Sequence, residues 1–271
     1  MIPLIIVAVL VILCAVFLFA VYPSVKGHPD LELLKGAQIA HRGLHDLEPG
    51  VPENSLPSFE AAAQKGYIIE NDIHITADGE VVIFHDHDPK RMCGVEGKLE
   101  EMTLAEIKQL RLLDTDLQIP TLQECLDLVD GRVPFLIEFK CTDQKTCERL
   151  CKAANEILSN YKGKYFVQSF YPPAMGWYKK HRKDICRGQL SCAFRNGGPL
   201  RNKLLACTVF NFISRPHFLS YCHQDENHPC RRLNTLLGAF PVGWTYTNQQ
   251  DIEKTKSKFN TYIFEGFIPE K

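Results

Sequence analysis

Several apolar runs of this chain contain or end in charged side chains. The runs 37–41 and 81–85 end in histidine, the run 67–75 carries two acids, and the run 134–140 ends in an acid and a lysine two residues apart. Strands buried on both faces are normally rich in Val, Ile and Leu, and a buried charge must be paired or bind a metal. These positions therefore indicate a reactive site. Its candidate residues are His41, Arg42, Glu70, Asp72, His85, Asp86, Glu138 and Lys140.

The three acids at these positions have the chemistry of a metal site. Glu70 and Asp72 are two residues apart, so they share one face of a strand. If Glu138 points into the same space, three carboxylates converge, and hard oxygen ligands of this kind suit Mg²⁺ or Ca²⁺. The alternative is that Glu70 and Asp72 are ion-paired with Arg42 and Lys140.

The two histidines could supply acid–base chemistry. Histidine titrates near neutral pH and can give or take a proton. On opposite sides of a bound phosphoryl group, one of His41 and His85 could activate the nucleophile while the other protonates the leaving oxygen. The guanidinium of Arg42 can donate two parallel hydrogen bonds to phosphate oxygens, and Lys140 supplies a compact positive charge. Taken singly, each histidine could equally be a hydrogen-bonded structural residue.

Strand-like runs alternate with helical patterns along the chain. Thr103 with Glu106, and Thr121 with Glu124, are capping boxes that predict helix starts. Such alternation is typical of parallel strands joined by crossover helices. The predicted strands are Ala37–His41, Tyr67–Ile75, Val81–His85, Pro134–Lys140, Tyr165–Phe170, Gly188–Ser191, Val209–Ser214, Val242–Thr247 and Tyr262–Phe267.

The length of the chain favours an α/β barrel. Eight βα steps fit if the run 81–85 is an added strand beside the run 67–75. A (β/α)8 TIM barrel takes ~250 residues, and residues 36–271 match that length. A doubly wound open sheet is the second choice. No GxGxxG follows the first strand, so a dinucleotide site has no support.

The first part of the chain predicts a membrane anchor. Residues 2–22 contain no charged side chain, and ~20 helical residues cross a ~30 Å hydrocarbon core. The alternative is a cleaved signal peptide, which normally has a basic N-terminal region and a small-x-small cleavage site. No Lys or Arg precedes the apolar run here. We therefore expect a single-pass transmembrane anchor over 1–24, a linker over 25–35 and the barrel domain over 36–271.

Charge and cysteine content bear on location and partners. Lys26 and Lys35 follow the span and no basic residue precedes it, which by the positive-inside rule predicts a cytoplasmic catalytic domain. The ten cysteines outside the span form no CxxC pair, and a domain of this size needs no disulfide framework. Lys and Arg total 31 against 32 Asp and Glu, so a nucleic-acid partner is not expected.

The motifs together resemble a known family. In order and spacing they are similar to those of the glycerophosphodiester phosphodiesterase family, phospholipase C-like phosphodiesterases with a TIM-barrel fold. The resemblance covers roughly residues 37–267, and the anchored layout is similar to membrane-linked bacterial members. The motifs are His41-Arg42-Gly43, Pro52-Glu53-Asn54-Ser55, Glu70-x-Asp72, Thr76-x-Asp78-Gly79, His85-Asp86, Glu138-x-Lys140 and Trp244-Thr245.

The resemblance implies hydrolysis of glycerophosphodiesters to glycerol 3-phosphate and an alcohol, with a divalent metal, Mg²⁺ or Ca²⁺. The implied roles are His41 and His85 as the acid–base pair, Glu70, Asp72 and Glu138 as metal ligands, and Arg42, Lys140 and Trp244 as substrate contacts. The chain departs from the family at Asn71, where a buried apolar residue is usual. Two other functions are a lysophospholipase D acting on membrane lysophospholipids and an inactive anchored scaffold.

Overall fold

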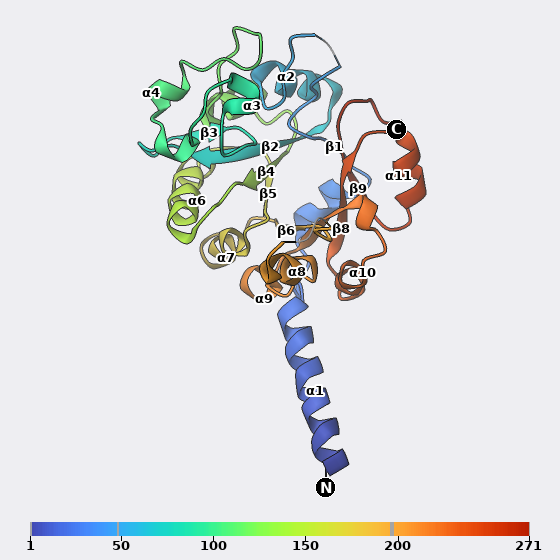
Figure 1. The fold of residues 1–271 in the computed structure, drawn as a ribbon. Helices are drawn as coiled ribbons and strands as arrows, with labels where there is room; N and C mark the ends of the chain where they lie inside the picture. The colour runs from blue at the N-terminus through green and yellow to red at the C-terminus, as the bar shows by residue number, and fades with distance from the viewer. Residues whose placement is uncertain (1, 48, 196–197, 271) are drawn as a thin grey trace.

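A computed structural model describes residues 2–47, 49–195 and 198–270 of the chain (Figure 1). Of the nine strands in these residues, eight form parallel pairs, and β1 pairs with both β2 and β9, which closes the barrel. The predicted TIM barrel is confirmed. The barrel strands are β1 (Gln38–Ala40), β2 (Ile68–Ile75), β4 (Phe135–Phe139), β5 (Tyr165–Ser169), β6 (Arg187–Ser191), β7 (Phe218–Cys222), β8 (Phe240–Tyr246) and β9 (Thr261–Phe264).

The ninth strand lies outside the barrel. β3 (Val81–Ile83) pairs antiparallel with the far end of β2, with His74 opposite Val82. This is the added strand that the sequence predicts. The chain then makes an excursion over the rim of the barrel before β4. The excursion contains α3 (Lys90–Cys93), η2 (Leu99–Glu101), α4 (Leu104–Ile107) and α5 (Leu122–Val129).

One predicted strand is wrong. Val209–Ser214 is not extended but ends in the short helix α9 (Asn211–Ser214), and the barrel strand is β7, which begins after Pro216. A short apolar run cannot be distinguished from a buried helical segment by its pattern alone. Here long-range contacts decide, because the buried Asn211 amide donates to the carbonyl of Val21 at 3.0 Å and to Asn234 at 2.7 Å.

The remaining helices surround the barrel. Both predicted capping boxes are present at Thr103 and Thr121, and Ser55 forms a third with Ser58. The basic residues at the end of α7 lie in its last turn, where they complement the helix dipole. The helices are α2 (Leu56–Lys65), α6 (Gln144–Leu158), α7 (Pro172–His181), α8 (Leu200–Ala206), α10 (Pro229–Leu236) and α11 (Gln249–Thr255), with the 3₁₀ turn η3 (His223–Asp225).

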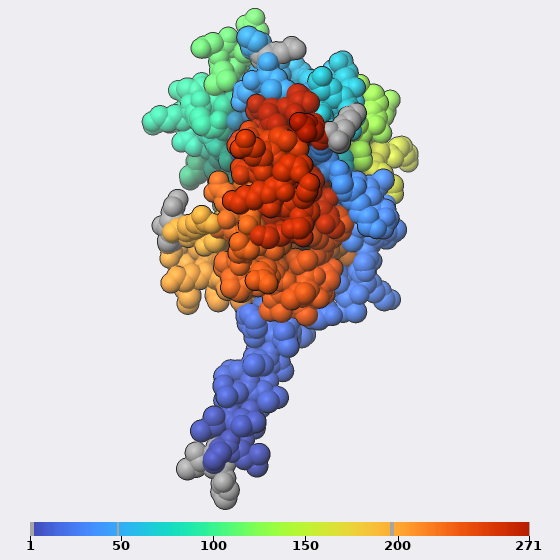
Figure 2. All heavy atoms as spheres, turned by 90° about the vertical axis from the view of Figure 1, so that its right-hand side faces the viewer, coloured from blue at the N-terminus to red at the C-terminus, as the bar shows by residue number. Residues whose placement is uncertain are grey.

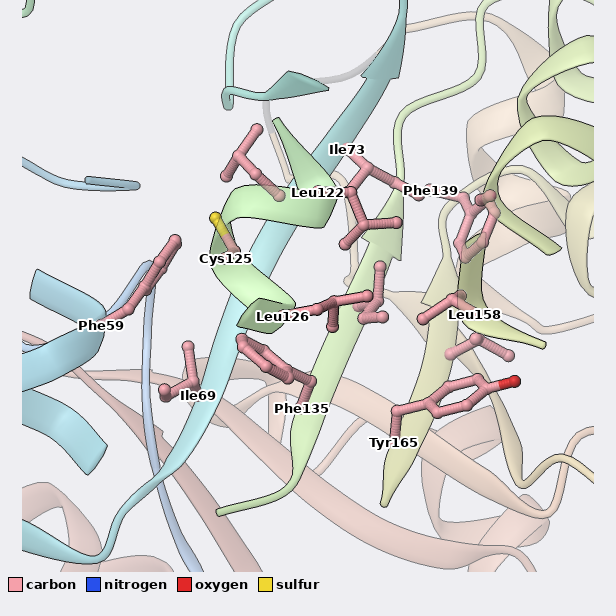
Figure 3. Close-up of a cluster of buried hydrophobic side chains, with 14 of the residues drawn as sticks. Phe59, Ile69, Ile73, Leu122, Cys125, Leu126, Phe135, Phe139, Leu158 and Tyr165 are labelled. Atoms are coloured by element: carbon pink, nitrogen blue, oxygen red, sulfur yellow. The ribbon is translucent and has the colours of Figure 1, made fainter. Parts of the chain in front are cut away.

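The alternation of side chains along β2 determines which residues enter the barrel. Ile69 and Ile73 point outward and pack against the helix layer, and Figure 3 shows Ile73 beside Leu122 of α5 and Ile69 on the side of Phe59. Ile68 belongs to the apolar cluster that fills the barrel interior. Glu70 and Asp72 share the face of Ile68 and therefore project into the barrel.

Asn71 occupies the opposite face of the same strand. It is completely buried among the outward-facing residues, and neither polar atom of its side-chain amide has a hydrogen-bond partner within the described residues. A buried polar group left in this state costs about 1–3 kcal/mol. The departure from the family pattern therefore carries a local cost in stability, but it leaves the inward face unchanged.

The first helix stands away from the barrel (Figures 1 and 2). α1 (Ile2–Val21) contains the stretch Pro3–Val21, which has a mean hydropathy of 3.5 and is 6% buried. By length and composition this helix is a membrane span or a signal sequence. Only its last turn packs on the domain, where Arg215 donates to the carbonyls of Phe19 at 2.8 Å and Tyr22 at 2.7 Å.

The attachment point lies at the amino ends of the strands. The N–H of Ser24 donates to the carbonyl of Pro216, just before β7. The following turn η1 (Pro29–Leu34) places Leu34 in the interior cluster of the barrel. The N–H of Gly36 then donates to Asn260, just before β9. The segment 22–36 therefore covers the end of the barrel opposite to the carboxyl ends of the strands.

Candidate active site

The carboxyl ends of the strands surround a cavity of about 360 Å³. Its wall takes residues from both halves of the chain, which only the closure of the barrel brings together. The predicted site residues His41, Arg42, Glu70, His85, Glu138, Lys140 and Trp244 all line it. Two candidates do not line it: Asp72 is completely buried next to Glu70 and Glu138, and Asp86 lies behind the ring of His85.

The three carboxylates converge because of strand register. Asp72 of β2 lies directly opposite Glu138 of β4, and Glu70 is one inward position earlier on β2. One oxygen of each lies within 4.8 Å of the others, and all three side chains are buried. Strand pairing thus fixes the group, as the spacing of the acids predicts.

Two cations contact the same carboxylates. Lys140 Nζ lies 2.9 Å from Asp72 Oδ1 and 2.7 Å from Glu138 Oε1. Arg42 Nε lies 3.6 Å from Asp72 Oδ2, and the backbone N–H of Arg42 donates to Glu70 Oε2 at 3.1 Å. The ion pairs that the sequence offers as an alternative to a metal site are therefore present together with the carboxylate cluster.

The charges of this group do not balance. Burial, with the neighbouring carboxylates of Asp72 and Glu138, holds the pKa of Glu70 well above its ordinary value. Burial opposes ionisation of Asp72 as well, but Lys140, His85 and Arg42 overcome it and hold its pKa well below the usual range. If all three acids were ionised, they would exceed the two fixed cations by one negative charge in a buried place, and the raised pKa of Glu70 reflects this excess. A divalent cation would neutralise it, and three carboxylate oxygens are ligands that Mg²⁺ and Ca²⁺ accept. The residues therefore fit such an ion.

The two candidate histidines of the cavity are each held by a carboxylate. His41 Nδ1 donates to Glu265 Oε2 at 2.5 Å, and His85 Nδ1 donates to Asp86 Oδ1 at 2.6 Å. These bonds leave Nε2 of each ring as the reactive atom. Burial lowers the pKa of both histidines, although Glu265 opposes this effect at His41 and Asp72 opposes it at His85.

A chain of ion pairs connects the two sides of the cavity. Arg42 Nη1 contacts Glu53 Oε1 at 2.8 Å, and Glu53 accepts from Arg91 at 2.7 and 3.0 Å. Arg91 Nε then donates to Asp86 Oδ2 at 2.7 Å, and Asp86 holds His85. The phosphate-binding candidate Arg42 and the acid–base candidate His85 are therefore positioned by one network.

Backbone geometry explains the first two motifs. Arg42 and Gly43 have positive φ angles of 55° and 80°. A Cβ on Gly43 would lie 2.8 Å from the carbonyl carbon of Ser58, so only glycine fits this turn. Asn54 also has a positive φ, of 53°, and its amide donates to Asp72 Oδ2 at 2.9 Å. The N-cap of α2 is the next residue, Ser55.

Two aromatic rings, those of Trp244 and Phe170, also line the cavity. Trp244 of β8 meets the Phe170 ring edge to face, with 5.7 Å between centroids. The indole Nε1 is buried and has no hydrogen-bond partner within the described residues. Trp244 therefore presents an apolar surface and one donor near the cavity, in keeping with its predicted substrate contact.

Sequence reasoning missed two residues of the site. Glu265 directly follows β9, so it obeys the rule that identified the other candidates, a polar residue at the end of an apolar run. Arg91 lies in α3, and no pattern in the sequence marks it. Its importance comes only from the folding of the excursion back toward Glu53.

Comparison with known proteins places the chain in a family. Residues 41–193 match the model of the glycerophosphoryl diester phosphodiesterase family. A glycerophosphodiester phosphodiesterase of Caldanaerobacter subterraneus subsp. tengcongensis is 32% identical over 239 residues, which cover 82% of this chain and 90% of that protein. Glycerophosphodiester phosphodiesterase 1 of Homo sapiens is 32% identical over 190 residues, covering 65% of this chain and 54% of that protein.

Solved structures share the fold. An Oleispira antarctica phosphodiesterase in complex with the product sn-glycerol-3-phosphate has a TM-score of 0.71 and 23% identity, covering 87% of this chain and 94% of that chain. A Thermotoga maritima glycerophosphodiester phosphodiesterase has a TM-score of 0.65 and 25% identity, covering 84% and 93%. The barrel and its polar cavity define a TIM-barrel enzyme. The chain belongs to the glycerophosphoryl diester phosphodiesterase family and is a phosphoric diester hydrolase.

Proposed function

We propose that this protein hydrolyses glycerophosphodiesters to glycerol 3-phosphate and an alcohol, with a divalent metal and a pair of histidines. One observation carries the proposal. Two histidines, each held through Nδ1 by its own carboxylate, line the same cavity as a buried carboxylate cluster and two cations. Cleavage of an anionic diester requires groups that transfer protons and positive charge that stabilises the phosphoryl oxygens, and these residues supply both.

The metal ligands are Glu70, Asp72 and Glu138. A Mg²⁺ or Ca²⁺ ion bound there supplies positive charge to a phosphoryl oxygen of the substrate. Strand pairing between β2 and β4 holds the three carboxylates before any ion arrives. The site is thereby preorganised by the most rigid part of the fold.

The protein's own cations bind the diester. Arg42 and Lys140 line the cavity and add positive charge where negative charge develops on the phosphoryl oxygens. Each is fixed by carboxylates, Arg42 by Glu53 and Lys140 by Glu138 and Asp72. Trp244 lines the opposite wall and contacts the organic part of the substrate.

The histidines move the protons. One takes a proton at Nε2 from the attacking water, or from the neighbouring glycerol hydroxyl if the reaction passes through a cyclic phosphate. The other gives its Nε2 proton to the departing alcohol oxygen. Glu265 and Asp86 hold the rings in the Nδ1–H tautomer and stabilise the imidazolium that forms, as a carboxylate does behind a catalytic histidine.

The position of α1 favours a water-soluble substrate. We propose that α1 spans the membrane, with the domain on the cytoplasmic side because Lys26 and Lys35 follow the span. Its last turn contacts the segment before β7, at the amino end of the barrel, whereas the cavity lies at the carboxyl end. A strand of five residues separates the ends by ~17 Å. The mouth therefore opens away from the bilayer, which disfavours a lysophospholipase D that takes its substrate from the membrane beside the anchor.

Turnover of the full-length chain in detergent micelles tests the proposal. Glycerol 3-phosphate should be released from glycerophosphocholine or glycerophosphoethanolamine, should stop in EDTA, and should return with Mg²⁺ or Ca²⁺. The His85→Ala variant, purified in parallel, controls for a contaminating phosphodiesterase. Faster cleavage of lysophosphatidylcholine would overturn the choice of substrate, and no cleavage of any diester would favour the inactive scaffold.

A membrane experiment tests the anchor separately. A span should remain in carbonate-washed membranes at full length, whereas a signal sequence should leave a shorter chain. The described cysteines are all unpaired thiols. An impermeant maleimide should fail to label them in intact cells if the domain is cytoplasmic, and labelling would place the domain on the other side.

A further inference from the structure

A second group of metal-ligand side chains lies beside the active site, and the reaction proposed above does not use it. His74 comes from β2, His87 from the loop after β3, and Glu100 from η2, and one atom of each lies within 4.8 Å of the others. Nδ1 of His74 and Nδ1 of His87 lie 3.2 and 3.0 Å from the same oxygen, Oε1 of Glu100. Neighbouring ligand atoms of a tetrahedral site with bonds of about 2.0–2.1 Å stand about 3.3 Å apart.

The other nitrogen of His74 has a partner of its own. Nε2 lies 3.4 Å from the backbone carbonyl of His85, which accepts a hydrogen bond from this nitrogen when the ring hydrogen is on Nε2. In that tautomer the lone pair of Nδ1 faces the Glu100 carboxylate, and the two can bind a cation between them. With the hydrogen on Nδ1, the same 3.2 Å separation is a hydrogen bond from His74 to Glu100.

We propose that His74, His87 and Glu100 form a second metal site, for a borderline cation such as Zn²⁺. Two imidazole nitrogens and one carboxylate oxygen are a frequent zinc ligand set. The bond from the far nitrogen of His74 to a backbone carbonyl is the support that metal-bound histidines usually have.

The site is separate from the carboxylate cluster. His74 is two residues beyond Asp72 on the inward face of β2, a distance of about 7 Å along the strand. Metals that act on one substrate as a pair are about 3.5–4 Å apart. The side chain of His87 is 45% exposed, so an ion can enter from solvent and a water can complete the coordination.

The ion would fix the loop that carries His85. The site joins β2, the loop after β3 and η2, and the N–H of Leu99 also donates to the carbonyl of His87 at 3.1 Å. His85 lies between β3 and His87, and its own carbonyl accepts from His74. A cation at the site therefore restrains the backbone on both sides of the acid–base candidate.

Zinc binding by the full-length chain in micelles tests the site without any turnover. After EDTA treatment and removal of the chelator, Zn²⁺ is titrated against a chromophoric competitor in excess Mg²⁺, which occupies the carboxylate cluster. One Zn²⁺ per chain should bind. His87→Ala and Glu100→Gln should each weaken binding at least about 100-fold, because even outer-shell changes at metal sites cost 10–100-fold. Co²⁺ in place of Zn²⁺ should give the visible absorption of a four-coordinate site in the wild type and lose it in both variants.

The matched control is Glu101→Gln, which removes a neighbouring exposed acid that pairs with Lys98. It should bind Zn²⁺ like the wild type. No Zn²⁺ retained in excess Mg²⁺, or equal binding by His87→Ala and the wild type, would overturn the proposal and leave a proton-shared His–Glu–His cluster. The result is independent of the proposed reaction, because a chain that binds Zn²⁺ here can still be inactive, and an active chain can lack this ion.

Discussion

Replacing Glu265 by glutamine should slow turnover about 10- to 150-fold while the barrel stays folded. Glu265 Oε2 accepts the Nδ1–H of His41 at 2.5 Å. A hydrogen bond to a charged group contributes about 1.5–3 kcal/mol, and 1.36 kcal/mol is a factor of ten in rate. The Glu265 side chain is 32% exposed, so solvent screening places the expected loss in the lower part of this range.

The same substitution should identify the role of His41 through the pH profile. Burial lowers the pKa of His41 and the hydrogen bond from Glu265 raises it. Without the carboxylate, the main effect that opposes burial is lost and the pKa of His41 falls further, although the charge of Asp72 still raises it. If His41 is the base, the acidic limb of kcat/KM moves to lower pH, because the ring is then deprotonated earlier. If His41 is the acid, the alkaline limb moves to lower pH, because the ring loses its proton earlier.

Initial rates of glycerol 3-phosphate release across the pH range provide the assay. One limb should move and the other, governed by His85, should stay. Glu253→Gln is the control, since Glu253 is a surface acid paired with Lys256, and it should behave like the wild type. A Glu265→Gln variant with unchanged kcat and two unchanged limbs would refute the reasoning, and equal movement of both limbs would indicate a change of the whole site.

Three further predictions concern single residues. His41→Ala and His85→Ala should each lower kcat at least about 100-fold, since a positioned acid or base contributes 10²–10⁴-fold to the rate. Their circular dichroism spectra should be unchanged. A near-normal kcat would reject the role of that histidine. Asp72→Asn should lose most turnover at any Mg²⁺ or Ca²⁺ concentration, and full rescue by added ion would show that this carboxylate is dispensable. Burial lowers the pKa of His217 to about 3. The unfolded chain therefore binds a proton that the folded chain does not, and the contribution of His217 to the free energy of unfolding is present above pH 6.5 and is lost as the pH falls toward 3. At pH 5 this loss is about 2 kcal/mol. His217→Asn, which can still accept from the N–H of Arg187, should flatten this part of the unfolding profile, and an unchanged slope would contradict the assignment.

The position of polar residues within apolar runs was sufficient to find most of the cavity. Parallel strands end at one rim, so residues that follow them must meet there, whatever their separation in sequence. This is why His41 and Lys140 could be grouped from their positions in the sequence alone. Glu265 was missed because the predicted run 262–267 extends past it, whereas β9 ends at Phe264 and leaves Glu265 at the rim.

What the sequence could not provide depends on long-range contacts. Arg91 belongs to the site only because α3 folds back toward Glu53, a separation of 38 residues. The run 209–214 has the composition of a strand, but the contact of Asn211 with the carbonyl of Val21, 190 residues away, belongs to a helix. In both cases the local sequence does not determine the structure, and contacts with distant residues do.

The two halves of the site are held by different means, and this difference has consequences. The carboxylates lie on paired strands, so their geometry depends on backbone register that no surface substitution alters. His85 lies on a loop, and its ring is held through Asp86 and Arg91, both partly exposed. Loss of a carboxylate should therefore change metal affinity while leaving the acid–base groups in place. Loss of Arg91 should leave metal affinity unchanged but allow His85 to move, so that kcat falls with no change in the metal concentration needed for half activation.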